Sequence, residues 1–141
     1  MKRSSAASAL RLRFIGELNL RGFSSRTIES YVGWVYDLAR HQRQSPDRLR
    51  DEQLKDYLLH LHQERNLTNN TIRVAVAALR SFYSLVQGRA VESLEPVLIT
   101  PRMEMRRPEI YSVEEVQRLL SVGAVDVRAR AFLATVYSAG L

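Results

Sequence analysis

Apolar residues recur at intervals of three and four along the first two thirds of the chain, which is the spacing of amphipathic helices. The pattern predicts four helices, at about residues 7–21, 26–42, 51–65 and 67–87. Gly22 and Gly88 stand where C-terminal glycines belong, and the expected N-caps are Ser24 or Ser25, Asp51 and Thr68. Since the connections are short and no stretch alternates like a strand, the sequence predicts a compact all-α unit of four helices that ends near Leu94.

The fourth predicted helix has two contrasting faces. One face is expected to be buried and consists of Ile72, Ala75, Val76, Leu79, Phe82, Tyr83 and Val86. The other combines short side chains, amides and two guanidinium groups, at Asn69, Asn70, Arg73, Ala77, Arg80 and Ser84. A nucleic acid duplex could approach that second face closely, and the free N–H groups of the first turn would favour a phosphate. The alternative is a face that contacts only solvent.

The last third of the chain is organised differently. Residues 96–108 contain three prolines and no sustained period, which predicts an extended linker made basic by Arg102, Arg106 and Arg107. Ser112 and Glu115 then form a capping box that opens a helix with Val116, Leu119 and Leu120 inward. A last helix is expected at about 127–139, with apolar residues at Phe132, Leu133, Val136 and Tyr137 and Gly140 as its stop. Two short helices cannot bury a core alone, so residues 109–141 are interpreted as the start of an incomplete second domain.

Composition and charge point to an anionic partner. The 141 residues are 45% hydrophobic and 26% charged, with a formal net charge of +6. Residues 1–26 hold six basic residues and one acidic residue, whereas residues 45–65 are slightly acidic. Charge is therefore polarised along the chain, as expected where some helices face nucleic acid.

Several classes of protein and site are disfavoured. No apolar run approaches membrane-spanning length and the N-terminus lacks the apolar core of a signal peptide, so a cytoplasmic protein without a membrane partner is expected. The absence of cysteine excludes disulfides and thiolate metal sites. His60 and His62 point to different sides of a helix and have no evident third ligand, so no metal and no cofactor are expected.

The second predicted helix should meet an anion mainly at its first turn. Glu29 and Asp37 lie further along its outer side and would repel a phosphate. Trp34 lies beside the apolar stripe and is expected to pack against a neighbouring helix or the linker. The N-terminal turn instead offers hydroxyl groups, free N–H groups and a cation, at Ser24, Ser25, Arg26 and Thr27.

Three stretches together suggest a family. The stretch LNLRGFSSRTIESYVGWVYDLARH carries a hydroxyl residue, a Thr and a Tyr four residues later, at Ser25, Thr27 and Tyr31. The stretch LTNNTIRVAVAALRSFYSLV has a polar cap, a Thr and an Ala-Leu-Arg-Ser-Phe-Tyr run at 78–83, and Pro108 precedes Ser-x-Glu-Glu-Val and Tyr-x-x-Gly-Leu. In this order, the stretches resemble the tyrosine recombinase (phage integrase) superfamily, and most of all the integrases of integrons and insertion sequences, which are mobile elements.

The resemblance implies three regions. These are a core-binding, SAM-like DNA-binding domain at 1–95, a basic linker at 96–108 and the truncated start of a catalytic domain at 109–141. The second and fourth helices would lie against double-stranded DNA as half of a C-shaped clamp, with the linker along the backbone. Other recombinase protomers on DNA are a further implied partner, and no small-molecule substrate is expected. The implied DNA-binding residues are Ser24, Arg26, Thr27, Tyr31, Thr68, Asn69, Asn70, Thr71, Arg73, Arg80, Arg102, Arg106 and Arg107.

The resemblance also bears on catalysis. In the family, the first catalytic arginine follows Gly-Leu, and the lysine, the His-x-x-Arg pair and the nucleophilic tyrosine lie further downstream. The sequence stops at Leu141, so no catalytic residue is assigned, and Tyr111 and Tyr137 match non-catalytic positions. The chain alone is expected not to cleave or join DNA, and is interpreted as a DNA-binding fragment that contributes to recombination and integration.

Two alternatives stay open at this stage. The protein could continue past Leu141 as a complete and active recombinase. It could also be an all-α transcription regulator or a protein-interaction module. Four helices followed by a basic linker and two unsupported helices are not the arrangement of an ordinary helix-turn-helix protein.

Overall fold

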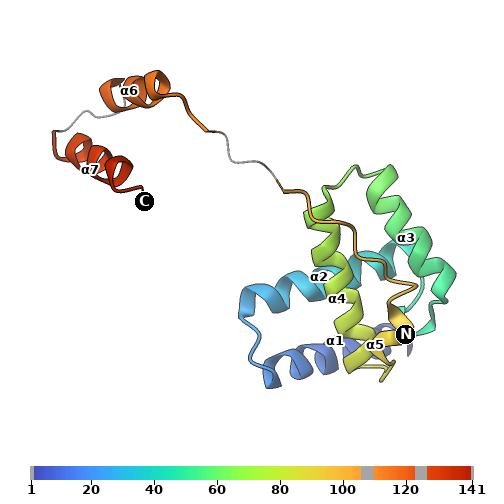
Figure 1. Ribbon diagram of the computed structural model, residues 1–141. Coiled ribbons are helices and arrows are strands. Elements are labelled where there is room, and N and C mark those ends of the chain that lie inside the picture. Colours follow the sequence, from blue (N-terminus) through green and yellow to red (C-terminus); the bar gives the residue numbers. More distant parts are fainter. Residues whose placement is uncertain (1, 106–109, 123–126, 141) are drawn as a thin grey trace. The chain divides into compact units, whose positions relative to one another are not determined.

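The computed structural model describes residues 2–105, 110–122 and 127–140, and its regular elements in this part of the chain are all helical (Figure 1). The chain divides into two compact units, Met1–Glu104 and Met105–Leu141. None of the described helices is long and apolar enough to cross a membrane. In chain order the elements are α1 (Lys2–Leu20), α2 (Ser25–Gln42), the 3-10 helix η1 (Pro46–Arg48), α3 (Asp51–Gln63), α4 (Asn69–Leu85), α5 (Val91–Leu94), α6 (Val113–Val122) and α7 (Val127–Ser138).

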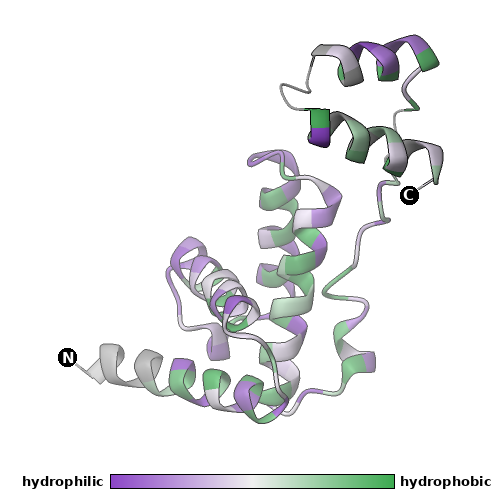
Figure 2. Ribbon diagram, turned by 90° about the vertical axis from the view of Figure 1, so that its left-hand side faces the viewer, coloured by the Kyte–Doolittle hydropathy of each residue, from purple (hydrophilic) through white to green (hydrophobic). Residues whose placement is uncertain are grey.

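Helices α1 to α4 form the core of the first unit, which confirms the predicted all-α class and the four-helix core. Helix α4 packs against α1, α2, α3 and α5, and most extensively against α2. Phe14 of α1 meets Phe82 of α4 edge to face at 5.4 Å, and the buried Tyr83 hydroxyl donates to the Pro46 carbonyl at 2.7 Å. The apolar segments of α4, green in Figure 2, alternate with polar ones because only one side of the helix is buried. The buried residues of α4 are Ile72, Ala75, Val76, Ala78, Leu79, Phe82 and Tyr83.

The ends of the helices follow most of the predicted signals. Ser24 and Thr68 cap α2 and α4, accepting from the backbone N–H of Thr27 and Thr71. Gly22 and Gly88 take positive φ values of 75° and 67°, which glycine adopts without a steric penalty. The prediction of Asp51 as an N-cap was wrong.

Asp51 is the first residue of α3, and the N-cap is Arg50. The backbone N–H of Arg50 donates to the Gln53 side-chain oxygen at 3.0 Å, so the glutamine supplies the reciprocal half of a capping arrangement. Asp51 instead accepts from the Arg89 guanidinium at 2.9 Å. A carboxylate in the first turn is favourable for the helix dipole even without capping it.

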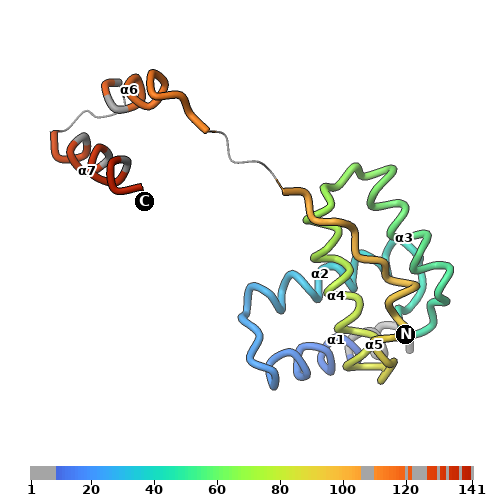
Figure 3. The backbone as a smooth tube through the Cα atoms, in the orientation of Figure 1, coloured from blue at the N-terminus to red at the C-terminus, as the bar shows by residue number. Residues whose placement is uncertain are grey.

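The chain after α4 remains part of the first unit for longer than the proline pattern suggested. Val97 and Leu98 are buried with the core, and their N–H groups donate to the carbonyl of Leu94 in α5. The chain then runs beside α4, as the orange tube in Figure 3 shows. Two apolar side chains thus anchor the beginning of the segment that was expected to be an extended linker.

The second unit contains α6 and α7. The predicted capping box of α6 is confirmed, because the Glu115 N–H donates to Ser112 Oγ at 3.2 Å and the Ser112 N–H donates to a Glu115 carboxylate oxygen at 2.8 Å. The inward position expected for Leu119 was wrong, since this side chain is 57% exposed, and Phe132 of α7 is 67% exposed. Two short helices offer each other too little apolar surface to cover such residues.

Candidate nucleic-acid interface

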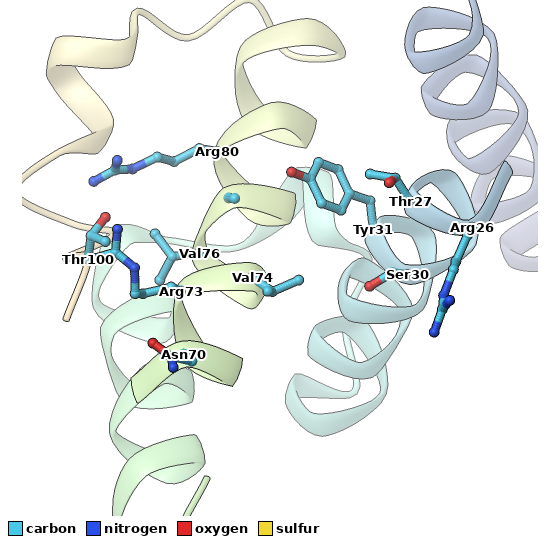
Figure 4. A pocket seen from close by; sticks show the side chains of 11 residues that line it. Arg26, Thr27, Ser30, Tyr31, Asn70, Arg73, Val74, Val76, Arg80 and Thr100 are labelled. Carbon is cyan, nitrogen blue, oxygen red and sulfur yellow. The ribbon is translucent and has the colours of Figure 1, made fainter. Parts of the chain in front are cut away.

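An open groove of about 720 Å³ lies between α2 and α4 and is bordered by the chain after α5 (Figure 4). It lies within the first unit. The groove brings together six of the residues expected to contact DNA, three from each helix. These residues are Arg26, Thr27, Tyr31, Asn70, Arg73 and Arg80, and the remaining lining is Ser30, Val74, Val76, Ala77 and Thr100.

The α2 wall begins at the N-terminus of the helix. Ser24 Oγ accepts from the Thr27 N–H at 3.3 Å and donates to Thr27 Oγ1 at 3.0 Å, which fixes the first turn. Arg26 is exposed, and Tyr31 stands one turn further along with its ring 5.8 Å from that of Phe23. In Figure 4 the Tyr31 hydroxyl points from α2 toward α4. The wall therefore offers a cation, hydroxyl groups and an N-terminal turn to an anion.

The α4 wall begins in the same way and continues with small side chains. Thr68 Oγ1 accepts from the Thr71 N–H at 3.4 Å, and Asn70 in the first turn is exposed. Val74 is 42% exposed although it is apolar, and Ala77 lies one turn beyond it. Small side chains let a large partner come close to the helix backbone.

Arg73 and Arg80 lie on this wall as predicted, but their guanidinium groups bind the protein's own chain. Arg73 Nη1 donates to the Pro101 carbonyl and Arg80 Nη2 to the Leu98 carbonyl, each at 2.7 Å. Figure 4 shows both side chains reaching away from α2, with Arg73 beside Thr100. These two cations are therefore not free in the way that the exposed Arg26 is.

The other predicted DNA-binding residues lie outside the lining of this groove. Ser24 and Thr68 are the caps, and Thr71 is half-buried beside its cap. Asn69 lines a different, mainly apolar depression between α3, α4 and the chain after α5, together with Leu58 and Ile99. Arg102 is exposed. Arg106 and Arg107 fall outside the described residues.

Of the two acidic residues on α2 that were expected to repel a phosphate, Glu29 is exposed and Asp37 is paired. Asp37 accepts from the Tyr57 hydroxyl at 2.6 Å and from Arg65 at 2.7 Å. Burial, together with the hydrogen bond to this carboxylate, raises the pKa of Tyr57 above its usual value, so the phenol stays protonated and donates. The Arg65 guanidinium also lies 6.0 Å from the Trp34 ring centroid, and Trp34 is half-buried against the core, where it was expected to pack.

Two histidines stand beside this cluster. The rings of His41 and His60 stack at 4.1 Å, and His60 Nδ1 lies 2.8 Å from a Glu64 carboxylate oxygen. Within the described ranges, no group of three or more His, Cys, Asp or Glu residues could hold a metal ion.

Ser30, Val74 and Thr100 line the groove but were not predicted as site residues. Ser30 follows Arg26 by four residues, so helical spacing already placed it on that face. Val74 has the same relation to Asn70, but it is apolar and was assigned to neither face of the helix. Nothing local marks Thr100, because its position depends on how the chain after α5 packs on α4.

Comparisons with known proteins agree with the helical unit. Residues 10–93 match the family described as phage integrase, N-terminal SAM-like domain. A putative integrase/recombinase of Sinorhizobium fredii is 38% identical over 132 residues, which cover 94% of this chain and 42% of that protein. An integrase/recombinase of Escherichia coli is 32% identical over 120 residues, covering 84% of this chain and 35% of that protein.

More distant similarity extends to other recombinases. The tyrosine recombinase XerC of Bacillus pumilus is 28% identical over 130 residues, covering 86% of this chain and 43% of that protein. The crystal structure of XerA recombinase superimposes with a TM-score of 0.58 at 20% identity, covering 90% of this chain and 44% of that one, which shows a shared fold. The chain spans about two fifths of the length of such relatives.

Proposed function

The chain belongs to the phage integrase family of N-terminal SAM-like domains, the core-binding domains of tyrosine recombinases, and we propose that its first unit holds duplex DNA in the groove between α2 and α4. The observation that carries the proposal is the convergence of two helix N-terminal turns, one exposed arginine and four hydroxyl residues on one open groove. We further propose that this binding serves DNA recombination and integration, the processes in which the relatives are named.

The first turns of α2 and α4 supply the phosphate contacts in this proposal. Each cap satisfies one N–H of its helix, which leaves further N–H groups of the first turn available to an anion. Arg26 adds a positive charge beside the first of these turns, and Asn70 adds an amide beside the second. Such contacts fix the position of a protein on DNA whatever the base sequence.

The floor of the groove determines how close the duplex comes. Val74 and Ala77 are small, and the Tyr31 hydroxyl points from α2 toward α4. Asp37 on α2 is held by Arg65 and Tyr57, so its charge is compensated, and the exposed Glu29 is not among the residues that line the groove. The groove therefore presents donors and small apolar groups to a polyanion.

Catalysis is left out of the proposed role. DNA breaking and rejoining through a phosphotyrosine belongs to the parent family, and we assign none of its residues to this chain. Incubation of the purified chain with supercoiled plasmid should produce neither nicked nor relaxed DNA. Relaxation that survives removal of contaminating nucleases would contradict this part of the proposal.

A titration of labelled duplex DNA at several salt concentrations tests the proposal. Binding should be in the micromolar range and weaken steeply between about 50 and 200 mM salt, because phosphate contacts release counterions. Arg26→Met should reduce the slope of log K against log salt by about one. Absence of binding, or binding insensitive to salt, would refute the proposal.

Arg48→Met is the matched control. Arg48 is also exposed but lies in η1 and is not among the residues that line the groove. The slope should stay at the wild-type value. An equal loss in both variants would mean that net charge alone, and not the groove, determines the affinity.

A further inference from the structure

The spacing of Arg73 and Arg80 along α4 matches the spacing of the two carbonyl groups that they bind in the chain after α5. Arg73 and Arg80 are seven residues apart, so they lie on one side of α4 and about 10.5 Å apart along its axis. Their acceptors, the carbonyls of Pro101 and Leu98, are three residues apart, which spans about 10 Å in extended chain. The later arginine binds the earlier carbonyl, so the segment runs antiparallel to α4.

Other contacts hold only the beginning of this segment. Val97 and Leu98 are buried, but Ile99 is 61% exposed and Met103 is 64% exposed. Among the described residues, no backbone–backbone hydrogen bond involves residues 99–105. Thr100 precedes a proline, which favours the extended conformation that two spaced donors can hold. The guanidinium groups therefore supply the fixed points for this stretch.

Arg80 is poorly placed to serve a phosphate instead. Its side chain is half-buried, and its Nε is buried without a hydrogen-bond partner. Turning the guanidinium outward would leave the Leu98 carbonyl without its donor, and hydrogen bonds from a charged donor are stronger than neutral ones.

We propose that Arg73 and Arg80 are positioning residues that clamp residues 98–101 along α4. The clamp makes the chain after α5 the third wall of the groove, because Thr100 lines it from this side. It also holds the exposed Arg102 one residue beyond the second fixed point. The consequence for DNA rests on the proposed function: these two arginines act on the duplex through the placement of Arg102.

Backbone ¹⁵N relaxation of the free protein tests the clamp without DNA. In the wild type, Ile99 and Thr100 should have order parameters near 0.85, the range of a rigid backbone. In Arg73→Met/Arg80→Met they should fall below about 0.6, while the amides of α4 keep their wild-type values. Arg80→Lys retains a donor and should restore part of the order at Ile99. If the double variant fails to fold, Arg73→Met alone should lower the order parameter of Thr100.

Arg26→Met is the control, since it removes an arginine from the opposite wall of the same groove. It should leave Ile99 and Thr100 rigid. Flexible residues 99 and 100 in the wild type, or unchanged order after loss of both arginines, would overturn the clamp.

A double-mutant cycle with duplex DNA tests whether Arg80 affects DNA binding through Arg102. Arg80→Met and Arg102→Met should each weaken binding several-fold, and the double variant should be within two-fold of Arg102→Met because both remove the same contact. A further ten-fold loss in the double variant would show that Arg80 contacts DNA directly and would overturn the positioning role. If the wild type binds no duplex, the proposed function fails, and the relaxation experiment still decides the clamp.

Discussion

The two faces of α4 have different roles. On one face, side chains such as Leu79 and Phe82 are at most 1% exposed and pack into the core. On the other, Asn70, Ala77 and Arg80 border an open groove. The core face takes its form from many mutual contacts, whereas the groove face depends on a few hydrogen bonds to the chain after α5. A substitution should therefore change stability on the first face and DNA binding on the second.

The largest effect is expected on the core face. Leu79→Ala removes a fully buried side chain from the centre of the unit and should lower the free energy of unfolding by about 2–5 kcal/mol, because it leaves a cavity. Urea denaturation followed by circular dichroism measures this change. A loss below about 1 kcal/mol would mean that α4 is not the centre of the core.

The next effect belongs to the groove face. Ala77→Glu places a carboxylate among groups that we propose to meet phosphates, and should weaken duplex binding by about ten-fold or more. The same substitution at the exposed Ala9 of α1 changes net charge equally and should weaken binding far less. Equal losses in the two variants would erase the distinction between the groove and the rest of the surface.

A smaller effect on stability is expected at the N-terminus of α4, where Thr68 caps the helix. Thr68→Ala removes the cap of α4 and should cost about 1 kcal/mol of unfolding free energy. Thermal or urea denaturation measures the loss, and Thr68→Ser, which keeps the hydroxyl, should restore most of it. A Thr68→Ser variant as unstable as Thr68→Ala would show that the methyl group, not the cap, matters.

The smallest change in stability is expected at an apolar residue of the groove face. Val74 is 42% exposed, so Val74→Ala should alter the unfolding free energy by less than about 0.5 kcal/mol. The measurement is the same denaturation series as for Leu79→Ala. A loss of 2 kcal/mol or more would place Val74 in the core and contradict the assignment of the two faces.

Much of this fold follows from local patterns in the sequence. The helix spacing of apolar residues identified the buried side of α4, and hydroxyl residues before Arg26 and Asn69 marked the starts of two helices. Asp51 was misplaced by one position because several residues near a helix start can compete for the N-cap, and here Gln53 supplied the bond. Local sequence chemistry is a more reliable guide to the approximate start of a helix than to the identity of its N-cap residue.

The groove was predicted only in part, for a physical reason. The spacing of Arg26 and Thr27 on α2, and of Asn70 and Arg73 on α4, indicated which faces were polar. It did not indicate that Arg73 and Arg80 would bind carbonyls of residues 98 and 101, because proline-rich chain has no periodicity that predicts where it packs. In the second unit, the apolar spacing of α6 wrongly placed Leu119 inward, because a side chain is buried only where another element covers it.

An NMR titration of the chain with a short duplex tests the central claim most directly. If the groove is the interface, the largest amide shift changes should lie in residues 24–31 and 68–77, and they should diminish as salt is raised. The amides around Lys55 and Leu59 of α3, which do not line the groove, should change little. Largest changes on α3, or no changes at all at low salt, would contradict the assignment of the groove as the DNA-binding surface.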